Sequence, residues 1–192
     1  MKQKAKEVKI QNIIDMAVSF SAMARVFEKG SAEKIKAKLN ETVEDFFSLK
    51  SSEEYYEKHG NFCSWFTSNI KTAERWKNDE IIKKSHFTSW GQAAKVLDIV
   101  LKVCIYYCNL PSVEDSSRIL IWLNGAIDTP IMEDLKMRYS LAILSQTNTI
   151  ESIDRQIYEE LQKLIREDIR KSFNNEIFAV QYDDMKWREL NR

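Results

Sequence analysis

The chain has 192 residues, a formal net charge of zero, 44% apolar residues and 30% charged residues. This composition is typical of a globular protein with one sizeable core, and the length is short for two independent cores. With four glycines, two prolines and no Asn-Gly or Asp-Gly turn between alternating runs, β-hairpins are disfavoured. We therefore expect a single all-α domain covering residues 1–192.

The first third of the chain carries clear helix signals. The apolar spacing in residues 5–28 predicts an amphipathic helix that stops at Gly30, and Ser31 is placed to cap a second helix. A capping-box pattern that begins at Ser51 predicts a short third helix, which ends at Gly60.

The next segment changes character. Asn61 can cap a fourth helix, and residues 74–87 are the most polar connection of the chain. We expect this connection to be a loop with a short helix, and the place where a mobile element would lie.

Residues 88–108 contain the longest apolar run, with Thr88 or Ser89 available as N-cap. Apolar side chains point in nearly every direction from Ala93 to Cys108, and a helix of that kind has to be surrounded by others. The run predicts a buried central helix over about 90–108, and two helical lobes flanking a cleft would be one way to surround it.

A polar stripe interrupts this helix, at Gln92, Lys95, Lys102 and Tyr106, with Asp98 at its edge. Two interpretations stay open. In the first, the stripe is a solvated face on which Asp98 and Lys102 form an i, i+4 pair. In the second, it lines an internal cleft.

Helix signals continue to the end of the chain. Ser112 is placed to cap a helix, and Thr129 is the expected N-cap of the next one, with Asp128 beside it. Residues 150–172 read as a long amphipathic helix, and the aromatic-rich tail 178–187 is expected to dock on the body.

Several kinds of site have no support. The three cysteines are odd in number and include no Cys-x-x-Cys pair, which excludes a disulfide framework or zinc site of the usual pattern. His59 and His86 are isolated, as surface or capping histidines would be, and no phosphate loop or nucleophile elbow is present. We expect no metal and no cofactor. No run of 18 apolar residues occurs, so we expect a cytoplasmic protein that does not bind membranes.

The distribution of charge bears on the partner. A neutral chain argues against extensive phosphate binding, but residues 71–102 hold seven Lys or Arg against four acids. This segment predicts a local basic patch beside the central helix.

Three sequence features recur in one known family. Lys95 and Lys102 form a Lys-x6-Lys pattern on a helix, Asp128 follows Lys95 by 33 residues at a helix start, and Asp183 and Trp187 form Asp-x-x-x-Trp. In this order they resemble the helix-hairpin-helix superfamily of DNA glycosylases, and most closely its archaeal-type 8-oxoguanine DNA glycosylases, over about residues 88–190. The resemblance implies a DNA-repair glycosylase and AP lyase that acts on damaged duplex DNA. It assigns catalysis to Lys95 and Asp128, and substrate binding to Lys102, Asp183 and Trp187.

These residue types suit that chemistry. A neutral lysine amine can attack the anomeric carbon of a sugar and form a Schiff base, and burial favours the neutral amine. An ionised carboxylate such as Asp128 can stabilise the positive charge that develops as the base leaves.

The alternative is a non-catalytic α-helical interaction protein, for instance an accessory or defence-system subunit. Its partner surface would be the aromatic set Tyr55, Tyr56, Phe62, Trp65 and Phe66. Lys95 and Asp128 in one cleft would favour the enzyme, whereas opposite faces would favour the interaction protein.

Overall fold

The computed structural model describes residues 2–20, 26–139 and 149–190, and within these ranges it contains eight α-helices. In chain order they are α1 (Lys2–Phe20), α2 (Ser31–Phe47), α3 (Ser52–Asn69), α4 (Trp90–Leu101), α5 (Val113–Ile119), α6 (Thr129–Tyr139), α7 (Arg155–Phe173) and α8 (Ala179–Leu190). A π-helix, η2 (Lys102–Tyr107), continues α4, and a 3-10 turn, η4 (Ile150–Ser152), precedes α7. The described strands are β1 (Arg75–Lys77) and β2 (Glu80–Lys83). The all-α prediction is confirmed, apart from this one small hairpin.

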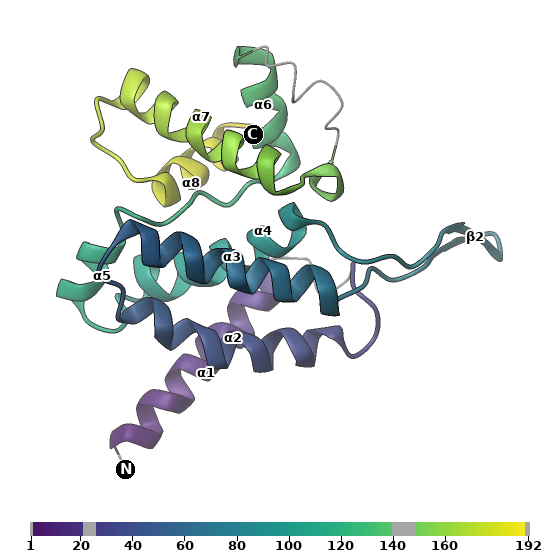
Figure 1. Cartoon of the computed structure of the whole chain (residues 1–192), viewed down its shortest axis with the longest axis horizontal. Coiled ribbons are helices and arrows are strands. Elements are labelled where there is room, and N and C mark those ends of the chain that lie inside the picture. Colours follow the sequence, from purple (N-terminus) through teal and green to yellow (C-terminus); the bar gives the residue numbers. More distant parts are fainter. Residues whose placement is uncertain (1, 21–25, 140–148, 191–192) are drawn as a thin grey trace.

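The helices form two groups with α4 between them. Figure 1 shows α1, α2, α3 and α5 on one side and α6, α7 and α8 on the other. Helix α4 packs against α1 and α3 of the first group and against α7 of the second. The predicted central helix therefore belongs to both halves of the core.

The start of α4 follows the predicted cap. The Ser89 hydroxyl accepts a hydrogen bond from Gln92 N at 3.2 Å, and the Gln92 side chain accepts one from Ser89 N at 2.9 Å. Nine of the twelve residues of α4 are buried, as its apolar character requires. Gln92 is therefore part of a buried cap and does not belong to a cleft-facing stripe.

Gly91 lets η4 approach the start of α4. A Cβ at Gly91 would lie 2.6 Å from Ile153 Cβ and 2.7 Å from Ile150 O, which no side chain could tolerate without a shift. Gly91 N donates to Ile153 O at 3.0 Å, and the Ser89 hydroxyl donates to Ile150 O at 2.8 Å. The segment before α7 is thus fixed on the first turn of the central helix.

Two predicted helix boundaries in the first third are wrong. Gly30, with φ of 86°, occupies the N-cap position of α2, and Ser31 is already helical and makes no capping hydrogen bond. Helix α3 runs through Gly60 without a break, so the third and fourth predicted helices are one. Packing along the whole length of α3 overrides the weak local preference of a single glycine. The first predicted helix is also too long, because residues 26–28 are not helical and Phe27 forms a bridge with Thr72, while residues 21–25 lie outside the described residues.

The polar connection 74–87 is a β-hairpin and not a loop with a helix. Strands β1 and β2 pair antiparallel across Asn78 and Asp79, whose φ angles of 51° and 64° are left-handed. Asn and Asp tolerate this region better than other non-glycine residues, so they can form a two-residue hairpin turn without glycine. This hairpin was not predicted because its turn contains neither Asn-Gly nor Asp-Gly.

The C-terminal tail docks as predicted, because Ala179, Val180 and Tyr182 of α8 are buried. None of the helices in the described ranges has the length and apolar character needed to cross a membrane.

Candidate functional site

A cavity of about 680 Å³ lies between the central helix, α4 with η2, and the helices α6 and α8, and all five predicted site residues line it. They are Lys95, Lys102, Asp128, Asp183 and Trp187. The wall also contains Tyr107 and Asp184, and its apolar part consists of Ile99, Val103, Ala126 and Ile131. Lys95 and Asp128 therefore face one cleft, and the stripe at positions 95 and 102 faces this cleft as the second interpretation predicts.

Lys95 is a partly buried cation on the wall of this cleft. Within the described ranges its ammonium group makes no hydrogen bond and no salt bridge. Burial lowers the pKa of Lys95 below its ordinary value, and the Lys102 charge adds to this effect, while the Asp128 and Asp183 carboxylates act in the opposite direction. An amine in this setting loses its proton more readily than an exposed lysine and is the natural nucleophile of the cleft.

Asp128 is the N-cap of α6. Its Oδ1 accepts a hydrogen bond from Ile131 N at 3.0 Å, so the cap is Asp128 and not the predicted Thr129. This bond fixes the carboxylate at the cleft wall, and an aspartate at a helix N-terminus is favoured by the helix dipole. Asp128 can cap α6 and also act in the cleft, because a carboxylate has further acceptor positions.

Lys102 ties the π-helix to the start of α8. Its ammonium group donates to Asp183 Oδ1 at 2.7 Å and to Asp184 Oδ1 at 2.9 Å, and only 13% of its side chain is exposed. Burial alone would lower the pKa of Lys102, but the two carboxylates raise it above its ordinary value. A phosphate group would have to compete with both carboxylates, so Lys102 is held as a positioning residue in this arrangement.

Asp183 sits at the floor of the cleft and is 2% exposed. Its Oδ2 accepts a hydrogen bond from Ala126 N at 2.5 Å, in addition to the Lys102 contact on Oδ1. Burial raises the pKa of Asp183 to about 7, although Lys102 and the Ala126 N–H act in the opposite direction. A Cβ at Gly125 would lie 2.8 Å from Ala179 O, so the glycine allows the chain before Asp128 to lie against α8.

Trp187 is 55% exposed, one turn of α8 after Asp183, and lines the same cavity. An aromatic ring with this exposure offers a face on which a planar ligand can stack.

Two polar residues of the cleft were missed by the sequence reasoning. The Tyr107 hydroxyl donates a hydrogen bond to Asp184 Oδ2, and Asp184 also binds Lys102. Tyr107 lies on η2, whose wider turn changes which side chains share a face, and π-helical turns occur frequently at functional sites. Asp184 lies on α8, next to Asp183. A spacing rule for a regular α-helix selects Tyr106 instead, and Tyr106 does not line the cavity.

The lowered pKa of Lys95 predicts how a reaction at its amine depends on pH. The neutral amine is the reactive form, so the single-turnover rate of covalent trapping on an abasic-site duplex should rise with pH and level off below pH 10.5. Trapping rates measured between pH 6 and 11 check this. A rate that keeps rising with hydroxide past pH 10.5 would indicate an ordinary lysine and contradict the prediction.

A second polar cluster lies inside the protein, around His59. His59 Nε2 is 3.1 Å from Asp98 Oδ1, and the Tyr158 hydroxyl donates to Asp98 Oδ2 at 2.7 Å. Burial by itself lowers the pKa of His59, but the neighbouring Cys63 and Asp98 raise it to about 10. The prediction that His59 is a surface or capping residue is wrong, and Asp98 pairs with His59 and not with Lys102.

The His59 ring contacts both Cys63 and Asp98: Cys63 Sγ is 3.7 Å from His59 Nδ1, and Asp98 Oδ1 is 3.1 Å from His59 Nε2. The thiol is fully buried, and it does not line the cavity of about 360 Å³ that His59 and Tyr158 border. No substrate reaches such a thiol, so this cluster holds α3, α4 and α7 together and is not a cysteine nucleophile with its base.

The cluster yields a stability prediction. Tyr158→Phe removes a hydrogen bond to a buried carboxylate, and it should lower the free energy of unfolding by about 1.5–3 kcal/mol. Tyr56→Phe is the matched control, because Tyr56 is exposed and its change should stay within about 0.5 kcal/mol. Urea denaturation of both variants measures the difference, and equal effects would contradict the assigned role of Tyr158.

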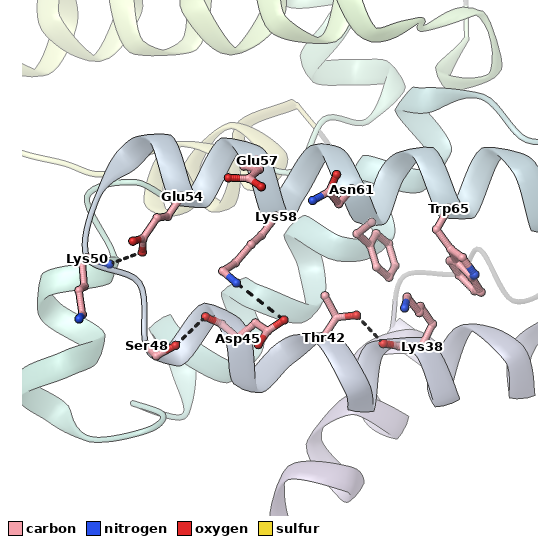
Figure 2. A pocket seen from close by; sticks show the side chains of 11 residues that line it. Lys38, Thr42, Asp45, Ser48, Lys50, Glu54, Glu57, Lys58, Asn61 and Trp65 are labelled. Atoms are coloured by element: carbon pink, nitrogen blue, oxygen red, sulfur yellow. Dashed lines mark hydrogen bonds and ion pairs between the residues drawn. The ribbon is translucent and has the colours of Figure 1, made fainter.

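The predicted aromatic partner surface is wrong, because Tyr55, Phe62 and Phe66 are core residues. Trp65 borders a groove between α2 and α3 instead. Figure 2 shows Lys58 and Asp45 reaching toward each other across this groove, with their charged atoms 3.8 Å apart. The charges of the groove are of both signs and several are paired, so it has no convergent set of groups like that of the Lys95 cleft.

Within the described ranges, no group of three or more His, Cys, Asp or Glu residues is arranged to hold a metal ion. No protein-family model matches the chain, and no solved structure matches it.

Proposed function

We propose that this protein is a DNA-repair glycosylase and AP lyase that acts on an extruded oxidised purine through Lys95. The observation that supports it best is that Lys95, Asp128, Asp183 and Trp187 line one cleft. The resemblance assigns these residues by their order and spacing, across almost a hundred positions of the chain, and they border the same space.

The chemistry proposed for Lys95 begins with its neutral amine. The nitrogen attacks the anomeric carbon of the nucleotide, the glycosidic bond breaks, and its electron pair leaves with the base, which takes up a proton. The substituted amine then loses one proton, the bond between the anomeric carbon and the ring oxygen breaks, and this oxygen takes up a proton, which leaves a protonated Schiff base between Lys95 and the sugar. The lowered pKa of Lys95 supports this role, because it enlarges the neutral fraction at neutral pH.

Asp128 is proposed to stabilise the reaction. Positive charge develops on the sugar as the base departs, and a carboxylate already fixed by the Ile131 N–H needs no reorganisation to oppose it.

The base itself is proposed to enter beside Trp187. An extruded base stacks well on an exposed aromatic ring, and Asp183 can accept a hydrogen bond from its edge through a remaining lone pair. Lys102 then acts by holding Asp183 and Asp184 in place. Extrusion itself costs a few kcal/mol, which contacts outside the cleft have to offset.

Borohydride trapping tests the proposal. Wild-type protein is incubated with duplexes that carry an oxidised purine or an abasic site, and a Schiff base becomes a stable covalent adduct on reduction. An adduct with lesion duplex and none with undamaged duplex is the expected result. If no oxidised-base or abasic duplex is trapped, the proposal fails, and the non-catalytic interaction protein takes its place.

A further inference from the structure

Residues 71–87 form a two-stranded arm that extends beyond the helices (Figure 1). The bridge between Lys71 and Phe87 continues the pairing of β1 and β2 toward the body. A two-stranded hairpin is marginal in water by itself, so its geometry depends on how its base is held.

Contacts at the base provide that support. Glu151 of η4 forms salt bridges with Arg75 and Lys83, and Thr72 N donates to His86 O at 2.8 Å. Because η4 is itself fixed on the first turn of α4, the arm starts from a firm base on the central helix.

The outer part of the arm is apolar and uncovered. Trp76 is 59% exposed, and it pairs across the strands with Ile81, which is exposed as is the adjacent Ile82. Large apolar side chains grouped on a projecting element mark a contact surface.

The arm is also basic, although the chain as a whole is neutral. It holds five Lys or Arg against three acids, a surplus of two. Lys77 and Lys84 are exposed, and neither ammonium group forms an ion pair or a hydrogen bond with another residue of the described ranges. Exposed cations beside an aromatic ring suit a polyanion with stacking faces, which is the chemistry of nucleic acid.

The arm is well placed to act with the cleft. Thr88 and Ser89 follow the arm, and Lys95 lies six residues beyond Ser89 along α4, about 9 Å at 1.5 Å per residue. The turn at Asp79 is eight residues from Phe87, which corresponds to a reach of about 26 Å at 3.3 Å per residue. That reach spans roughly eight base pairs at 3.4 Å each. A two-stranded ribbon fits a DNA groove, and apolar side chains on such elements wedge between base steps.

We propose that residues 71–87 are a DNA-binding arm that holds the duplex beside the lesion, which rests on the proposed function. Lys77 and Lys84 bind backbone phosphates, and Trp76 stacks on or wedges between bases that flank the extruded nucleotide. The arm supplies binding and bending outside the cleft, and the cleft supplies the chemistry.

The test compares three variants of the full chain with wild type. Trp76→Ser removes the ring, Lys77→Ser with Lys84→Ser removes the two free cations, and Lys34→Ser with Arg170→Ser is the control that removes two exposed charges on α2 and α7. Fluorescence anisotropy with an abasic-site duplex, at several salt concentrations, gives affinity and salt slope, and borohydride trapping is measured beside it.

Trp76→Ser should weaken duplex binding by about 5- to 100-fold, the range found for loss of one base–aromatic stack. The Lys77 and Lys84 double variant should lower the slope of log affinity against log salt by about two, and the control pair should not. At saturating protein, the control pair should trap as wild type does, because it changes neither the arm nor Lys95.

The outcomes of these experiments test the DNA-binding role of the arm and the proposed glycosylase function independently. Arm variants that bind duplex as tightly as wild type overturn the arm, whether or not trapping occurs. Arm-dependent duplex binding without any trapping supports the arm and refutes the glycosylase. Vesicles of phosphatidylglycerol and phosphatidylcholine give the remaining comparison, since arm-dependent vesicle binding without duplex binding would make the arm a membrane contact and overturn the proposal.

Discussion

Replacing Lys95 with glutamine is expected to abolish covalent trapping on an abasic-site or oxidised-purine duplex. Glutamine keeps nearly the length of the side chain and its hydrogen-bonding capacity, but it has no amine with which to form a Schiff base. The rest of the cleft should persist, because the Lys95 ammonium group makes no hydrogen bond or salt bridge with the described residues. Gel separation after borohydride reduction measures the loss directly.

Two controls make the Lys95 result interpretable. Lys163→Gln, an exposed lysine paired with Glu160 on the surface of α7, should trap as wild type does. Duplex affinity of Lys95→Gln, measured by anisotropy, should stay within a few-fold of wild type, because the arm and not Lys95 is proposed to supply binding. Trapping by Lys95→Gln at the wild-type rate would refute Lys95 as the nucleophile.

Asp128→Asn is expected to slow base release by roughly 10²–10³-fold, the range found when one preorganised electrostatic contact is removed from an active site. Asparagine is as good an N-cap as aspartate, so the hydrogen bond from Ile131 N and the start of α6 should be kept. The substitution therefore removes the charge and leaves the local structure. Single-turnover kinetics on a lesion duplex measures the rate.

Thermal unfolding provides the control for Asp128. The melting temperature of Asp128→Asn should stay within a few degrees of wild type, and Asp128→Ala, which loses the cap as well, should cost about 1 kcal/mol of stability. If Asp128→Asn releases the base at the wild-type rate while Asp128→Ala is destabilised, then Asp128 is only a helix cap.

The sequence by itself determined the elements whose signals are local. The apolar run at 88–108 required a surrounded helix, and Ser89, Ser51 and Ser112 marked helix starts at which their side chains do accept the expected hydrogen bonds. Caps and periodicity depend on residues within one or two turns, so they can be read from the chain without knowledge of what packs against it. The candidate site residues came instead from the resemblance to a glycosylase family, which rests on their order and spacing along the chain.

Only the tertiary structure determined which partner each polar group contacts. The sequence reasoning allowed Asp98 to pair with Lys102, four residues away, but Asp98 binds His59 on α3, and Lys102 binds Asp183 and Asp184 on α8. In each case the cause is burial, because a desolvated charge gains much more from a buried partner across the core than from an exposed neighbour on its own helix. Such partners lie 39 and 81 residues apart, and no local pattern identifies them.

Burial also explains why the arm was not predicted from the sequence, because in the arm burial is absent. Residues 74–87 lack the apolar alternation of a strand because the hairpin buries neither face, so periodicity had nothing to detect. Its shape comes from Asn78 and Asp79 in the turn and from Glu151, 68 residues beyond Lys83, at the base. Local residues made the hairpin possible, and the long-range contact with Glu151 fixed its base beside the central helix.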